Sequence, residues 1–170
     1  MYRQAEMLFD YINKNPQFLN PTTHLSQGKL LMRMGRTAEA KEFFELALAE
    51  QERLRQRYPD NPEPDRRAGK ILTLLARRQE ATRAFQVAIE KDRARLERAI
   101  DDATKARVYR SLGQTLYAMG DSEAALNHIS MALALAPDRK TRYEVGRVTL
   151  WDPKSGAPTT PYLHLKVYHH

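Results

Sequence analysis

The side chains of this sequence that could most readily bind a metal ion are three histidines near its C-terminal end, His164, His169 and His170. Neutral imidazole is the commonest metal ligand in proteins, so such a group is a candidate site. His164 and His169 are five residues apart, however, and alternation along an extended strand places them on opposite faces. The adjacent pair at the end also resembles the remnant of a purification tag. We therefore predict no native metal site.

Catalytic chemistry is not supported by the spacing of the reactive residues either. Asp101 and Asp102 are adjacent carboxylates, but they lie between two helical patterns, where helix capping explains them better than a paired acid–base site. The sequence has no GxSxG, HExxH, P-loop or GxGxxG motif. It also has no cysteine, which removes thiol catalysis, disulfides and zinc–thiolate sites. We predict that the protein is not an enzyme and needs no cofactor.

The composition is typical of a soluble globular protein with a basic bias. The 170 residues include 28 Lys and Arg against 21 Asp and Glu, which gives a net charge of +7, and 42% of the residues are hydrophobic. The sequence lacks an apolar run of about 18 residues that could span a membrane, and residues 1–16 lack the apolar core of a signal peptide. We therefore expect one compact domain or a short repeat array in the cytoplasm, with acidic partners favoured by the basic excess.

A recurring pattern of small and large residues indicates packed pairs of helices. Within residues 106–139 the pattern consists of Tyr109, Leu112, Gly113, Leu116, Gly120, Ala125, Ile129, Ala132 and Pro137. Small residues let two helix backbones approach closely, and large residues at helical spacing fill the space between the helices. Gly120 and Asp121 are suited to end the first helix and begin the second.

Two earlier segments carry the same pattern in the same register. Residues 21–54 contain Gly28, Leu31, Gly35, Ala40, Phe44 and Ala47, and residues 62–95 contain Gly69, Leu72, Ala76, Ala81, Phe85 and Ala88. Asn20–Pro21 and Asn61–Pro62 each place a capping residue before a proline suited to the first helical position. The second junction has neither Gly nor Pro, so we expect a tight turn there, capped by Asp101 or Asp102. The copies predict three consecutive helical hairpins.

This pattern resembles the tetratricopeptide repeat (TPR), a helix–turn–helix unit with the signature W-x2-L-G-x2-Y…A-x3-F…P. Tyr109 stands in place of the Trp and Ile129 in place of the Phe in the clearest copy. The resemblance implies an all-α fold, a right-handed α-solenoid of three TPR-like hairpins. We place the repeats at residues 21–61, 62–105 and 106–139.

The copies are longer than the usual TPR of about 34 residues. Gly28 and Gly69 are 41 residues apart, and Gly69 and Gly113 are 44 residues apart. We expect the extra residues to be shared between the two helices of a hairpin, because the helical pattern continues beyond each copy. The period is similar to that of the repeats of kinesin light chains and related bacterial signalling proteins.

The two ends of the chain differ from the repeats. Ala5, Phe9 and Ile12 are spaced like one helix face, so we predict a leading helix in residues 1–20. This helix is either a cap or half of a preceding repeat, and the second alternative makes the chain part of a longer protein. Residues 140–170 are predicted to form a covering helix and a short, partly extended tail, because residues 147–151 and 162–168 alternate. The tail packs on the last repeat or adds a strand to a partner's sheet.

The resemblance to TPR proteins also implies a concave groove lined by the first helix of each repeat. Carried over by position, the groove residues are Leu25, Lys29, Met32, Arg33, Arg66, Lys70, Thr73, Arg107, Arg110, Gln114 and Tyr117. Six of these eleven residues are basic and none is acidic, which favours an acidic or extended peptide as the ligand. The same pattern also fits exposed helix faces on which Lys and Arg are simply solvated.

The function that these observations predict is a scaffold for protein–protein interaction that binds a peptide segment of a partner. A regulatory or oligomerising TPR segment of a larger signalling or transcription protein is an alternative, and self-association would make the chain a homo-oligomer. Nucleic-acid binding is disfavoured, because stacking of bases needs aromatic side chains among the cations and the groove offers Tyr117 alone.

Overall fold

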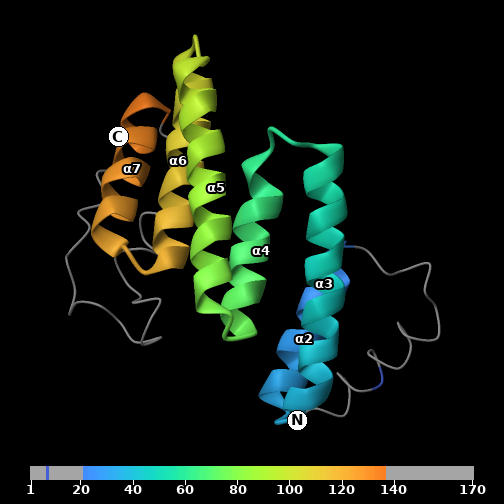
Figure 1. Cartoon of the computed structure of the whole chain (residues 1–170). Coiled ribbons are helices and arrows are strands. Elements are labelled where there is room, and N and C mark those ends of the chain that lie inside the picture. Colours follow the sequence, from blue (N-terminus) through green and yellow to red (C-terminus); the bar gives the residue numbers. More distant parts are fainter. Residues whose placement is uncertain (1–6, 8–20, 137–170) are drawn as a thin grey trace, which may run out of the picture. The chain divides into compact units, whose positions relative to one another are not determined.

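The computed structural model describes Met7 and residues 21–136 and shows six helices in the second of these segments (Figure 1). These are α2 (Pro21–Arg33), α3 (Thr37–Arg57), α4 (Pro62–Leu74), α5 (Arg78–Glu97), α6 (Asp102–Met119) and α7 (Ser122–Leu135). Every regular element in residues 21–136 is a helix, which confirms the all-α prediction and is consistent with a TPR-like helical solenoid. Apart from Met7, the predicted leading helix at 1–20 and the predicted C-terminal segment at 140–170 lie outside the described residues.

The chain divides into two compact units, Met1–Val87 and Ala88–His170, and the division falls within α5. In the first unit, α2 and α3 form a hairpin whose helices cross where Gly28 faces Phe44. A Cβ atom at position 28 would lie 2.5 Å from Cε1 of Phe44, so no other residue fits there without a shift. Phe44 is fully buried, and Leu31 of α2 and Ile71 of α4 belong to the same hydrophobic cluster.

The same contact between a glycine and a large side chain recurs at the other two helix crossings. Gly69 of α4 faces Phe85 of α5, and a Cβ atom at position 69 would lie 2.5 Å from Cε1 of that ring. In the second unit, Gly113 of α6 faces Ile129 of α7, and a Cβ atom at position 113 would collide with the isoleucine side chain. Because the pattern of small and large residues recurs at each crossing, the local sequence explains why the helices pair closely.

Helix starts and stops agree with the predicted capping residues. The Asn61 side chain accepts a hydrogen bond from the Glu63 amide, and Pro62 occupies the first position of α4. Asp101 caps α6 by accepting a hydrogen bond of 2.7 Å from the Thr104 amide. The Thr104 hydroxyl donates a second hydrogen bond of 2.7 Å to the other oxygen of Asp101. The two bonds hold the pKa of the Asp101 carboxyl below its usual value, and the bond from the hydroxyl makes the largest contribution. Both capping predictions are confirmed, whereas Asn20 lies outside the described residues.

The extra length of the repeats is distributed unevenly. In the first hairpin α2 has 13 residues and α3 has 21, and in the second α4 has 13 and α5 has 20. In the third hairpin α6 has 18 residues and α7 has 14. The expectation that both helices of a hairpin share the extension is therefore wrong for the first two, where the second helix carries it. The longer second period arises because α6 begins 11 residues before Gly113, whereas α4 begins 7 residues before Gly69.

The turn within each hairpin has one residue in the left-handed conformation. Gly35 and Gly120 have φ angles of 78° and 90°, and Ala76 occupies the matching position with a φ of 60°. At each turn two backbone amides bond back to the end of the first helix, as Ala76 N–H does to the Thr73 carbonyl at 3.1 Å. This pattern is the Schellman helix end, in which glycine is favoured because it has no Cβ atom. Ala76 adopts the same geometry with a steric penalty.

We expect the substitution Ala76→Gly to raise the free energy of unfolding by about 0.5–1 kcal/mol, because it removes this penalty while making the unfolded chain more flexible. The gain is measured by urea denaturation followed by circular dichroism. Ala49→Gly is the control, since Ala49 is exposed inside α3 and should lose about 1 kcal/mol on the same change. A loss of stability in Ala76→Gly would contradict the left-handed geometry at this turn.

Candidate peptide-binding groove

Three of the predicted groove residues line one cavity on α2. Lys29, Met32 and Arg33 lie three and four positions apart and therefore share one helix face. The cavity has a volume of about 540 Å³, and its other lining residues are Ser26, Leu30 and Leu74. Leu74 comes from α4, so the cavity lies between the first helices of two successive hairpins. It combines two cations with apolar side chains, of which Met32 is 37% exposed.

Leu25, the remaining predicted residue on α2, has a different position. It is half-buried and packs against the hydrophobic cluster that includes Leu31 and Phe44. Its side chain therefore contributes to the packing of α2 on α3.

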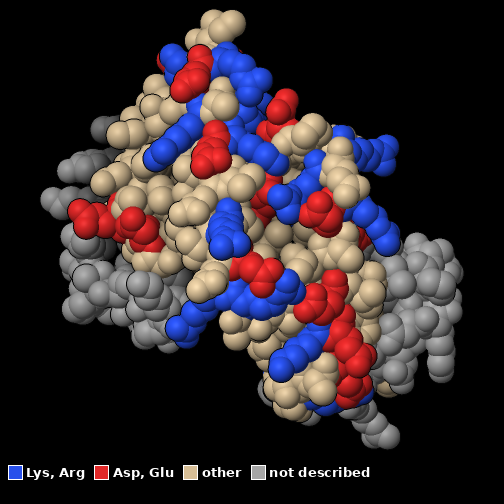
Figure 2. All heavy atoms as spheres, in the orientation of Figure 1, with Lys and Arg blue, Asp and Glu red and all other residues tan. Residues whose placement is uncertain are grey.

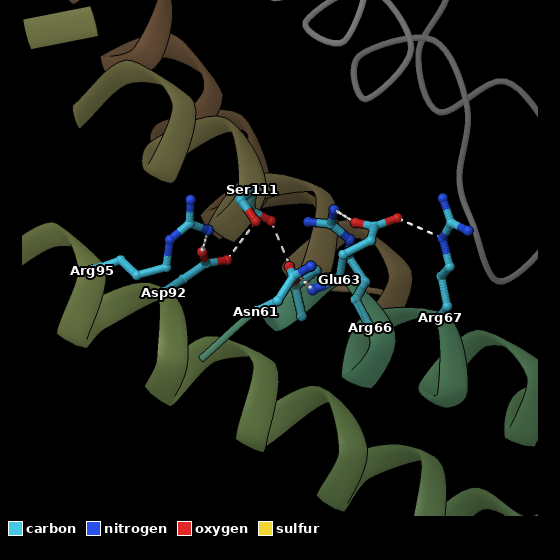
Figure 3. Close-up of polar contacts among 8 residues, drawn as sticks. Asn61, Glu63, Arg66, Arg67, Asp92, Arg95 and Ser111 are labelled. Carbon is cyan, nitrogen blue, oxygen red and sulfur yellow. Dashed lines mark hydrogen bonds and ion pairs between the residues drawn. The ribbon is translucent and has the colours of Figure 1, made fainter. Parts of the chain in front are cut away.

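Arg66 on α4 is 8% exposed, and its guanidinium forms an ion pair with the Glu63 carboxylate. The other oxygen of Glu63 accepts a hydrogen bond of 2.7 Å from Nε of Arg67. Figure 3 shows this carboxylate held between the two arginines. One predicted cation of the groove therefore already has an acidic neighbour, and its charge is less available to a ligand.

The other predicted residues of α4 are at the surface. Lys70 and Thr73 are exposed, and the Thr73 hydroxyl donates a hydrogen bond of 2.9 Å to the Gly69 carbonyl one turn earlier. Because such a bond leaves an acceptor site on the hydroxyl oxygen, Thr73 retains the ability to accept from a ligand.

The predicted residues of α6 belong to the second unit. Arg107 is exposed and donates a hydrogen bond of 3.3 Å from Nε to the Ala103 carbonyl, while Arg110 and Gln114 are half-buried. Tyr117 is 8% exposed and packs with Ala125 and Ile129 in the core of the third hairpin. The tyrosine ring is therefore a packing element of α6 on α7.

The structure thus brings Lys29, Met32 and Arg33 together in one cavity and places the α6 residues in another unit. The sequence interpretation missed Ser26, Leu30 and Leu74, which complete the cavity, and it missed Glu63. A signal for Glu63 was present, because this residue precedes Arg66 and Arg67 by three and four positions, the spacing at which opposite charges pair on a helix.

At each of the two junctions between successive hairpins, one fully buried carboxylate connects the hairpin to the helix that follows it. In the first unit, Nε of Arg55 on α3 lies 2.8 Å from the carboxylate of Asp65 on α4. In the second unit, the Ser111 hydroxyl of α6 donates a hydrogen bond of 2.5 Å to Asp92 of α5. Asp92 also pairs with Arg95 at 3.1 Å (Figure 3). Because both acids are buried against partners on neighbouring helices, they connect these helices and offer no exposed acid–base site.

Comparison with known proteins gives one family match. Residues 22–53 match the tetratricopeptide repeat family, and this segment covers nearly all of α2 and most of α3. The match identifies the first hairpin as similar to one tetratricopeptide repeat. Members of this family are in general non-catalytic modules that mediate protein–protein interaction. No curated protein matches the chain significantly. Within residues 21–136, the helices lack the combination of length and apolar character needed to cross a membrane.

The contact between Glu63 and Arg66 generates a prediction about stability. We expect Glu63→Gln to lower the free energy of unfolding by about 1–2 kcal/mol, because it leaves a largely buried guanidinium without its carboxylate. The matched control is Glu39→Gln, whose pair with Arg36 has the same spacing but is exposed on both sides. Urea denaturation should show a clearly smaller loss for Glu39→Gln, and equal losses would mean that burial of Arg66 contributes nothing.

Proposed function

We propose that this chain is a non-catalytic scaffold for protein–protein interaction, acting in the cytoplasm, which binds an acidic or extended peptide segment of a partner in the groove of its first helices. The observation that carries this proposal is the cavity of about 540 Å³ on α2, where Lys29 and Arg33 flank Met32. The general role in protein–protein interaction follows from the family match at residues 22–53. The chemistry of the ligand is our inference from the cavity.

The cavity suits a peptide that carries a carboxylate beside an apolar side chain. A carboxylate can accept two parallel hydrogen bonds from the guanidinium of Arg33 and a further one from the ammonium of Lys29. An apolar side chain can be buried against Met32, Leu30 and Leu74, and the flexible thioether of methionine adapts to side chains of different shape. Recognition of this kind combines an apolar contact, which contributes affinity, with a charged contact, which selects the ligand.

The exposed residues of the neighbouring first helices extend this proposal. Lys70 and Thr73 on α4 are exposed and belong to the same unit as the cavity, and the Thr73 hydroxyl can accept a hydrogen bond from the peptide. Arg66 has a smaller part in the proposal, because Glu63 already neutralises much of its charge. Burial of Tyr117 supports a peptide over a nucleic acid as the ligand, since base stacking needs an accessible aromatic face.

The proposal is tested by the double charge reversal Lys29→Glu with Arg33→Glu. The probes are short fluorescein-labelled peptides in which Asp or Glu lies next to Leu or Met, and binding is measured by fluorescence anisotropy at about 0.15 M salt, where charges more than about 8 Å apart are largely screened. We expect the affinity for the acidic peptides to fall at least about tenfold, because the variant replaces two attractive contacts with repulsive ones.

The matched control is Lys41→Glu with Arg53→Glu, which makes the same change in net charge on exposed residues of α3. This variant should bind the acidic peptides as the unchanged protein does. Peptides with Asn and Gln in place of Asp and Glu should bind weakly to all three proteins. Equal loss in both double variants would reduce the effect to net charge and would contradict a specific groove on α2.

A further inference from the structure

A second cavity lies in the first unit among α3, α4 and α5, and none of the predicted groove residues lines it. Its volume is about 560 Å³. Leu48 of α3, Leu72 of α4 and Val87 of α5 contribute apolar side chains to its wall, and alanines such as Ala49 and Ala84 leave the space open. We name it the second-helix cleft, because most of its lining comes from the second helices of two hairpins. Ligand pockets in proteins commonly have volumes of about 300–1,000 Å³, so this cleft has the size of a binding site.

The charges around the second-helix cleft are balanced in number. Three lining residues are acidic, Glu45, Glu52 and Glu80, and three are basic, Arg55, Arg77 and Arg83. Figure 2 shows acidic and basic side chains intermixed over the face of the molecule that carries α3. The three arginines differ, however, in whether they are paired with these acids.

Arg77 binds two of the three acids. It donates hydrogen bonds of 2.7 and 2.5 Å to the two oxygens of Glu80, and its Nη1 lies 3.3 Å from both oxygens of Glu45. The hydrogen bonds hold the pKa of the Glu80 carboxyl below its usual value and raise the pKa of Arg77. Since Glu45 belongs to α3 and Arg77 directly precedes α5, this ion pair connects α3 to the beginning of α5.

Arg55 binds the third acid. Its Nη1 lies 2.8 Å from Glu52, and its Nε lies 2.8 Å from the buried carboxylate of Asp65. The acids of the cleft are therefore all bound to Arg55 or Arg77. Arg83 is exposed, and within residues 21–136 it makes no hydrogen bond or ion pair. Its charge contributes to lowering the pKa of the Glu80 carboxyl, which lies three residues earlier on the same helix. A cation without a hydrogen bond or ion pair to the described residues therefore lines the cleft beside its apolar side chains.

We propose that the second-helix cleft is a docking site for a protein segment that presents an apolar side chain next to a carboxylate. The apolar side chain packs against Leu48, Leu72 and Val87, and the carboxylate binds Arg83. The charge complementarity selects an acidic residue, since the other two arginines are already bound to acids. This site goes beyond the proposed groove function, because it uses α3 and α5 and shares no residue with the cavity on α2.

The test uses an array of short fluorescein-labelled peptides, each with one Leu and one Glu at every spacing within one helical turn, and measures binding by anisotropy. Arg83→Glu removes the cation, and Ala84→Trp fills the cleft. Each variant should weaken the best-bound peptides at least about tenfold, as expected for loss of a charged contact or of the apolar pocket. Circular dichroism melting of each variant shows that the fold is retained.

Arg93→Glu is the matched control, because Arg93 is exposed and lies ten residues beyond Arg83 on the same helix, about 15 Å away. It should leave binding unchanged. All of these proteins also carry Lys29→Glu with Arg33→Glu, which removes acidic-peptide binding to the groove on α2, so that the remaining binding reports on the second-helix cleft alone. Failure of every peptide to bind, or equal loss in Arg83→Glu and Arg93→Glu, would overturn the proposal. A dimer in sedimentation that Arg83→Glu dissociates would also overturn it, by assigning the cleft to a second copy of the chain.

Discussion

Close contact between a glycine and a large side chain at each helix crossing is the constraint on which the hairpins depend. The pairs are Gly28 with Phe44, Gly69 with Phe85, and Gly113 with Ile129. Each glycine lets two backbones approach until the large side chain fills the space above it, so the crossing point and the rotation of both helices are set together. Once the rotation is set, the remaining faces of the helices are assigned to the core, to the next hairpin or to solvent. The positions of the groove and the second-helix cleft follow from this choice.

A second constraint acts between a hairpin and the helix that follows it. Arg55 with Asp65 joins α3 to α4, and Asp92 with Ser111 joins α5 to α6. In both places a carboxylate is fully buried, and its removal from water has to be offset by a bound partner. Apolar contacts tolerate small displacements, whereas a buried carboxylate loses its hydrogen bonds when its donors move away. We infer that these pairs fix the register of successive helices at the cost of some stability.

The sequence predicted those features that depend on neighbouring residues. Asn61 and Asp101 cap helices because their acceptor groups reach amides two or three residues away, and Gly120 ends α6 because it tolerates a positive φ. The burial of a side chain and its contacts with residues far away in the sequence could not be predicted. The resemblance to TPR proteins placed Tyr117 on the groove face, but its burial depends on how α7 packs against that side chain. The role of Asp92 needed Ser111, a residue on another helix and 19 positions away.

Charge pairing limits what the basic excess of +7 can do. Arg55, Arg66 and Arg77 are each bound to acids on their own or a neighbouring helix, so they contribute to the packing and the surface of the scaffold. An arginine already bound to a carboxylate attracts a second one less strongly, because the two charges largely cancel at the distance of a ligand. Attraction of an acidic partner therefore depends on the cations that the scaffold does not use. Lys29 and Arg33 on α2 and Arg83 on α5 meet this condition beside apolar side chains, and an acidic segment with an apolar residue satisfies both kinds of contact at once.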